Sequence, residues 1–128
     1  MITKSDSQAL LLIVDDEPGM RDTLSDILEE FAFVVHQAEN GMEALAKVQA
    51  NRYDLVLMDM RMPQMDGAET LKRLRMITPD VPVVMMTAVA EAAALDQAFD
   101  QGAQAILYKP LDIAKLVCLV EKLLAREA

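Results

Sequence analysis

Five short apolar runs alternate with longer segments of helical periodicity along the 128-residue chain. The runs are rich in Val, Ile, Leu and Met and are often apolar at consecutive positions, as in strands covered on both faces. They span residues 9–14, 33–37, 54–58, 81–87 and 104–108. Such alternation predicts an α/β fold, (βα)₅, with an open doubly wound five-stranded parallel sheet in three layers, α/β/α.

Capping residues and apolar stripes indicate the helices between these runs. Pro18 suits a first helical turn, and Asn40 and Asp66 are expected to cap the second and third helices. An alanine-rich fourth helix is expected over residues 91–101, ended by Gly102, and a last helix begins near residue 112. The inward stripe of the first helix is Met20, Leu24, Ile27, Leu28 and Phe31. That of the last is Ile113, Leu116, Val117, Val120 and Leu123.

Composition and charge limit the classes of function. A formal net charge of -9 argues against direct nucleic-acid binding by this domain and against an anionic membrane surface. The single cysteine, Cys118, excludes an intramolecular disulfide and is expected to be a buried, inert thiol. The chain has no apolar run long enough for a membrane span and no signal-peptide pattern, so a cytoplasmic location is expected.

The length suits one domain, expected over residues 9–126 behind a disordered tail of residues 1–8. The ends of the chain suggest the N-terminal piece of a longer regulator. Two polar features are interpreted as structural. His36 lies in a predicted strand, and the basic cluster of Lys72, Arg73 and Arg75 is taken as a solvated helix face. The ten methionines are interpreted as adaptable core and loop filler.

Polar residues stand where four of the predicted strands end. Asp15 and Asp16 follow the first strand, Asp59 follows the third, Thr87 ends the fourth and Lys109 follows the fifth. Because the carboxyl ends of parallel strands share one edge of a sheet, these residues are expected to converge. Each acid alone could be a cap or turn residue. Together, three carboxylates for a divalent cation, a hydroxyl and a lysine predict a site for phosphoryl transfer.

The stretches around these residues resemble the receiver domain of two-component response regulators, over about residues 9–125. They are Val-Asp-Asp-Glu at 14–17, Asp59 with Met-Pro-Gln-Met-Asp-Gly at 62–67, Thr-Ala at 87–88 and Lys-Pro at 109–110. The resemblance implies a flavodoxin-like receiver fold and a cis Lys109-Pro110 bond. It also implies a bacterial phosphorelay protein that is no enzyme beyond its own phosphorylation and dephosphorylation.

The resemblance assigns a role to each site residue. Asp59 is the phosphoacceptor, and its phosphoryl group comes from a sensor histidine kinase or a phosphotransfer protein. Asp15, Asp16, Asp59 and the backbone carbonyl of Arg61 bind Mg²⁺ or another divalent cation such as Mn²⁺. Thr87 and Lys109 contact the phosphoryl group. The face formed by the helix expected over residues 91–101, the strand over 104–108 and the last helix then switches to control a partner or a downstream effector, such as a transcription regulator. The same face supports a phosphorylation-promoted homodimer.

Some residues depart from the family pattern or leave alternatives open. Ile106 stands where the family often has an aromatic switch residue, and Tyr108 is expected on the strand face opposite Lys109. The side chain of Arg61 either pairs with a nearby acid or lies in solvent. An aspartyl-nucleophile phosphatase is an alternative class, but it usually needs an Asp-x-Asp pattern and a cap. A receiver-like module that is never phosphorylated is another, but it usually lacks an acid or the lysine.

Overall fold

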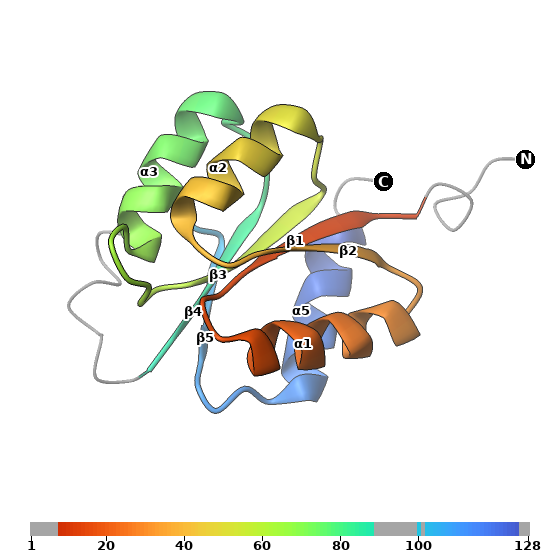
Figure 1. Cartoon of the computed structure of the whole chain (residues 1–128). Coiled ribbons are helices and arrows are strands. Elements are labelled where there is room, and N and C mark those ends of the chain that lie inside the picture. The colour runs from red at the N-terminus through yellow and green to blue at the C-terminus, as the bar shows by residue number, and fades with distance from the viewer. Residues whose placement is uncertain (1–7, 89–99, 101, 126–128) are drawn as a thin grey trace, which may run out of the picture.

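The computed structural model describes residues 8–88, 100 and 102–125. In this part of the chain, five parallel strands form one sheet in the order β2-β1-β3-β4-β5. Helices α2 and α3 cover one face of the sheet, and α1 and α5 cover the other (Figure 1). The predicted doubly wound, three-layered α/β fold is confirmed. No helix within the described residues is long and apolar enough to cross a membrane.

The strands are β1 (Leu10–Val14), β2 (Val34–Ala38), β3 (Leu55–Asp59), β4 (Val83–Thr87) and β5 (Ala105–Tyr108). All five predicted runs are strands, with shifted ends. β4 begins two residues later than predicted, after Pro82, which has no N–H to donate to a neighbouring strand. β2 begins one residue later, because the N–H of Phe33 donates to the carbonyl of Leu28 at the end of α1.

The described helices are α1 (Pro18–Glu30), α2 (Gly41–Ala50), α3 (Gly67–Ile77) and α5 (Ile113–Ala125). Both predicted caps are confirmed. Asn40 accepts a hydrogen bond from the N–H of Glu43 at 2.7 Å, and Asp66 accepts one from the N–H of Glu69 at 2.8 Å. The helix predicted over 91–101 falls almost wholly outside the described residues, as do positions 1–7 of the predicted tail and residue 126.

Alternate residues of the central strands supply two aliphatic layers, because successive side chains of a strand point to opposite faces. Leu12 and Val56 pack toward α2 and α3, whereas Leu11 and Leu55 pack toward α1 and α5. The prediction that methionines fill the core holds for Met58, Met60, Met62, Met85 and Met86, which are all buried, but Met42 and Met76 are exposed on helices. His36 is hydrogen-bonded through Nδ1 to the hydroxyl of Tyr53 at 2.8 Å, consistent with its predicted structural role.

The prediction of a buried Cys118 is wrong, and the predicted apolar stripes of α1 and α5 are wrong at their edges. Cys118 is exposed, because α5 buries Leu116 and Val120 and a residue two positions past Leu116 lies about 200° round the helix. At the edges of the predicted stripes, Phe31 is 48% exposed and Ile113 is 38% exposed. α5 is apolar on more than one face, so its apolar residues alone could not identify the inward side.

Arg75 is not part of a solvated basic face. Its guanidinium is half-buried and donates to the carbonyls of Val81 at 2.6 Å and Gly102 at 2.8 Å. Burial lowers the pKa of this guanidinium, and the negative charge of Asp80 offsets part of the decrease. Arg73, by contrast, makes an exposed ion pair with Glu69 at 2.9 Å.

Candidate functional site

Asp59 is the last residue of β3 rather than the first residue of the loop, and it is 5% exposed. The turn that follows it is tightly tied. The N–H of Met60 donates to the carbonyl of Met86, and the carbonyl of Met60 accepts from the N–H of Gly67, both at 2.8 Å. A side chain at Gly67 would collide with the Asp59 carbonyl and lie 2.8 Å from the Cα of Met60. The start of α3 therefore packs directly on the backbone that presents Asp59.

The two acids after β1 differ in exposure. Asp15 is fully buried, whereas Asp16 is exposed. The N–H of Asp15 extends the β1–β2 pairing by donating to the carbonyl of Ala38 at 3.1 Å. Its Oδ1 accepts from the N–H of Glu17 at 3.0 Å, which closes a short turn into α1. The buried carboxylate is thus oriented by its own loop.

The last two strands supply a hydroxyl and an ammonium group. Thr87 ends β4, is buried, and donates its hydroxyl to the carbonyl of Ala88 at 3.1 Å. Lys109 follows β5, and its N–H donates to the carbonyl of Thr87 at 2.7 Å. The Lys109 ammonium lies 3.0 Å from Oδ1 of Asp59 and 3.7 Å from Oδ2 of Asp15. The Lys109-Pro110 peptide is cis, as predicted.

Burial dominates the electrostatics of the two enclosed acids. It raises the pKa of Asp59, although the hydrogen bond and charge of Lys109 and the N–H of Arg61 offset part of the rise. Burial also raises the pKa of Asp15, opposed by the Glu17 N–H and reinforced by the charge of Asp59. Burial disfavours the charged form of Lys109, but the neighbouring acids, Asp59 first, raise its pKa overall. The site holds negative charge at a cost in free energy that a further cation would relieve.

The three acids suit such a cation. Asp15, Asp16 and Asp59 each offer a carboxylate oxygen, and these oxygens lie within 4.8 Å of one another. The buried Oδ2 of Asp15 has no hydrogen-bond partner among the described residues. Its ion pair with the Lys109 ammonium is long, at 3.7 Å, so this buried oxygen has room in its coordination for a further ligand. All-oxygen donors of this kind match hard divalent cations.

The structure brings together four of the predicted site residues and places Thr87 on the strand beside Asp59. Arg61 lies in the loop after β3 with its side chain exposed. Sequence analysis did not single out Arg21, whose guanidinium donates to the carbonyl of Asp15 at 2.6 Å. Its position one turn into the helix that follows the acid pair was the available signal.

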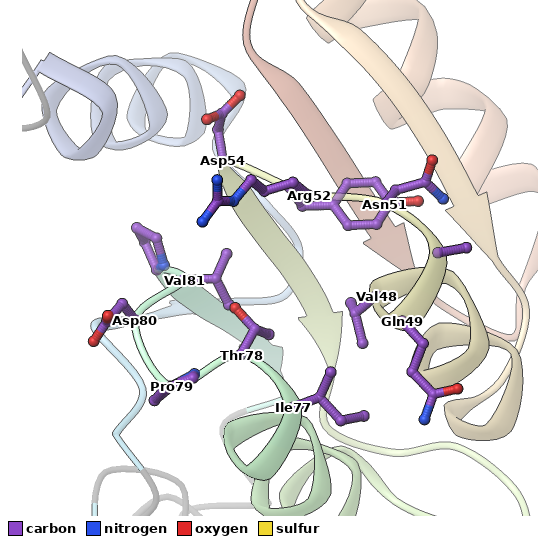
Figure 2. A pocket seen from close by; sticks show the side chains of 13 residues that line it. Val48, Gln49, Asn51, Arg52, Asp54, Ile77, Thr78, Pro79, Asp80 and Val81 are labelled. Carbon is purple, nitrogen blue, oxygen red and sulfur yellow. The ribbon is translucent and has the colours of Figure 1, made fainter.

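A pocket of about 700 Å³ lies at the amino-terminal ends of the strands, away from the acids at the carboxyl ends. It is lined by the segments that precede β3 and β4, including Arg52, Asp54, Ile77 and Asp80 (Figure 2). The acids instead follow β1 and end β3. The hollow and the acid cluster are therefore separate features at opposite ends of the same strands.

Comparison with known families supports the phosphoryl-transfer interpretation. The family model described as "Response regulator receiver domain" matches residues 11–121, which is most of the chain. A two-component response regulator from Clostridium difficile has a similar structure, with a TM-score of 0.89 and 31% sequence identity. That match covers 94% of this chain and 98% of the solved one.

Curated relatives differ greatly in length. Sporulation initiation phosphotransferase F of Bacillus subtilis is 40% identical over 114 residues, covering 89% of this chain and 92% of the relative. Transcriptional regulatory protein ZraR of Klebsiella oxytoca is 40% identical over 121 residues, which are 94% of this chain but 27% of that protein. The chain therefore spans about a quarter of the length of one relative and nearly all of the other.

Proposed function

The chain belongs to the response regulator receiver domain family and acts in phosphorelay signalling, and we propose that Asp59 is the residue that accepts the phosphoryl group. One observation carries this assignment. The buried carboxylate of Asp59 is hydrogen-bonded to Lys109 at 3.0 Å and lies beside two further acids. The nucleophile Asp59, the Lys109 ammonium and carboxylates able to bind a metal thus lie close together.

The chemistry follows from these contacts. A carboxylate oxygen of Asp59 attacks the phosphorus of a phosphohistidine, a P–O bond forms, and the P–N bond to the histidine breaks. Lys109 stays beside the acceptor and neutralises charge on the phosphoryl oxygens. The hydroxyl of Thr87 turns from the Ala88 carbonyl, which it contacts in this structure, toward a phosphoryl oxygen. Rotation of the Thr87 hydroxyl thus couples phosphorylation of Asp59 to the end of β4.

Mg²⁺, or another divalent cation such as Mn²⁺, would be bound by the carboxylates of Asp15, Asp16 and Asp59 and by the backbone carbonyl of Arg61. When bound, the cation supplies positive charge that offsets the transferred phosphoryl oxygens and the crowded carboxylates. Oδ2 of Asp15, which is buried and makes no hydrogen bond among the described residues, supports this part of the proposal, either by direct coordination or by holding a water.

The phosphoryl donor would be a sensor histidine kinase or a phosphotransfer protein, and the domain would act on no other substrate. The output would be a partner protein or an effector domain. The names of the relatives, one a phosphotransferase and one a transcriptional regulator, support both kinds of output.

Phosphorylation would also promote pairing of two copies through β5 and α5, together with the helix predicted over 91–101. Apolar side chains on β5 and α5 support this, since Tyr108 is 48% exposed and Ile113 is 38% exposed. Light scattering with beryllium fluoride, which mimics the phosphoryl group, should show a doubled mass. An unchanged mass at concentrations where the mimic saturates the site would argue against the dimer.

Replacing Asp59 by Asn tests the phosphoacceptor directly. Incubation with Mg²⁺ and acetyl phosphate should add one phosphoryl group to the wild type and none to Asp59→Asn, measured by intact mass. Asp66→Asn is the matched control, because Asn also caps a helix and the loop keeps its fold. Modification of Asp59→Asn to the wild-type extent would overturn the assignment.

A further inference from the structure

We infer that Arg21 is a positioning residue for the metal-binding acids, an assignment that rests on the proposed function. The Nη1 of Arg21 donates to the backbone carbonyl of Asp15 at 2.6 Å. That carbonyl belongs to the peptide that joins Asp15 to Asp16. One side chain on α1 therefore holds the link between the two acids.

This link matters more for Asp16 than for Asp15. The loop already orients Asp15 through its own N–H and its Oδ1. Asp16 is exposed, so the direction of its carboxylate depends on the backbone that carries it. Fixing the peptide before Asp16 fixes where its Cα and side chain begin. A charge-assisted hydrogen bond from a guanidinium is strong enough to do this.

Arg21 is itself held in place by a residue on the edge strand. Gln37 of β2 accepts from Nε of Arg21 at 3.2 Å. The amide nitrogen of Gln37 donates to the hydroxyl of Ser25 at 2.8 Å and to Asp22 at 3.3 Å, both on α1. The guanidinium is thus fixed at two points, one on Gln37 and one on Asp15. Lysine has no planar fork and could not make both contacts in the same geometry.

The network is also more than a tie between a helix and a strand. A bond that only joined α1 to β2 would need Gln37, Ser25 and Asp22 but not the carbonyl of Asp15. Residues that orient metal ligands in this indirect way typically change metal affinity by about 10- to 100-fold when they are replaced. A purely structural tie would change stability and leave the affinity of the folded protein as it was.

Calorimetric titration of Mg²⁺ into the unphosphorylated protein separates these two roles. Arg21→Ala should raise the Kd for Mg²⁺ by about tenfold, and Arg21→Lys should recover little of it. Gln37→Leu keeps the charge of Arg21 and should raise the Kd by a smaller factor in the same direction. Arg73→Ala removes an exposed arginine from α3 and should bind Mg²⁺ like the wild type.

The rate of phosphorylation by acetyl phosphate gives a second readout. In Arg21→Ala, the Mg²⁺ concentration that gives half the maximal rate should rise about as much as the Kd. The plateau rate at saturating Mg²⁺ should stay within about twofold of the wild type, because Arg21 contacts neither Asp59 nor the phosphoryl group. If Arg21→Ala does not fold, Arg21→Lys and Gln37→Leu carry the same test.

The inference is overturned if a folded Arg21 variant binds Mg²⁺ like the wild type, or if it loses plateau rate with no change in Mg²⁺ dependence. It also falls if the wild type binds no Mg²⁺. The Mg²⁺ titration requires no phosphorylation. A failure of Asp59 to be modified, with Mg²⁺ binding weakened in Arg21→Ala, would therefore refute the phosphoacceptor proposal and leave the positioning role standing.

Discussion

The parallel sheet has one edge formed by the amino-terminal ends of its strands and another formed by their carboxyl ends. These two edges hold their charged residues in different ways. At the amino-terminal edge of the strands, charges are tied to the backbone. Asp54 accepts from the N–H of Leu10 at 2.8 Å, and Arg75 donates to the carbonyls of Val81 and Gly102. At the carboxyl edge, Asp15 also accepts a backbone hydrogen bond, but the Lys109 ammonium lies between Asp15 and Asp59 and pairs with both acids.

The difference separates polar groups that hold the fold together from those proposed to bind a ligand. A pocket of about 700 Å³ lies at the amino-terminal edge, yet Asp54 and Arg75 there already bind strand and loop ends. The carboxyl edge buries two acids with raised pKa values and leaves Oδ2 of Asp15 without a hydrogen bond among the described residues. Incomplete pairing, rather than open volume, indicates where a ligand belongs.

The largest effect is expected from crowding the carboxyl edge with Gly67→Ala. The added Cβ would meet the backbone of Asp59 and Met60, which cannot yield as a flexible side chain would. We expect a loss of about 3 kcal/mol in the free energy of unfolding, measured by urea titration. Gly19→Ala is the control, because nothing lies within 4 Å of an added Cβ there. Equal stability of the two variants would show that the edge is not tightly packed.

Arg75→Met should weaken the amino-terminal edge without touching the chemistry. It removes the donor to the carbonyls of Val81 and Gly102, and we expect a loss of about 2 kcal/mol. Arg73→Met, which loses only an exposed ion pair, should cost less than about 1 kcal/mol. Urea unfolding measures both. Phosphorylation of the folded Arg75→Met protein should be normal, and a change in its Mg²⁺ dependence would break the contrast between the edges.

Asp15→Asn should stabilise the protein in the absence of divalent cations. Burial raises the pKa of Asp15 above its ordinary 3.8, so its contribution to stability is greatest below pH 3.8 and is lost as pH rises through the raised value. The variant avoids that loss and should be more stable than the wild type at neutral pH.

Thermal unfolding in a chelator, followed by circular dichroism over a pH series, measures the effect of Asp15→Asn. The advantage should shrink as the pH falls through the raised pKa of Asp15, because the wild-type acid then takes up a proton. Added Mg²⁺ should raise the melting temperature of the wild type more than that of the variant. An advantage that is independent of both pH and Mg²⁺ would mean that Asp15 carries no buried charge to relieve.

The strands and the rim residues could be predicted from the sequence because both follow from local order. Apolar runs located the strands to within two residues, and parallel pairing then required Asp15, Asp59 and Lys109 to share an edge. The strand ends were less predictable, since they depend on individual hydrogen bonds. Asp59, for example, still pairs within the sheet opposite Met86.

Contacts between distant segments could not be predicted. Arg75 looked like a member of a basic cluster, but its partners at Val81 and Gly102 are known only once β4 and β5 are placed. Arg21 likewise depends on Gln37, which a separate strand brings alongside α1. Cys118 was placed wrongly because an apolar helix does not reveal by composition which side faces the sheet.

The order of the strands along the chain also determines when during synthesis Asp15 and Lys109 can come together. Asp15 directly follows the first strand of the chain, and Lys109 directly follows the last one. A nascent chain on the ribosome cannot join them until synthesis has passed residue 109 and β5 has docked beside β4. Chains that end before residue 109 therefore lack the lysine and cannot complete the cluster.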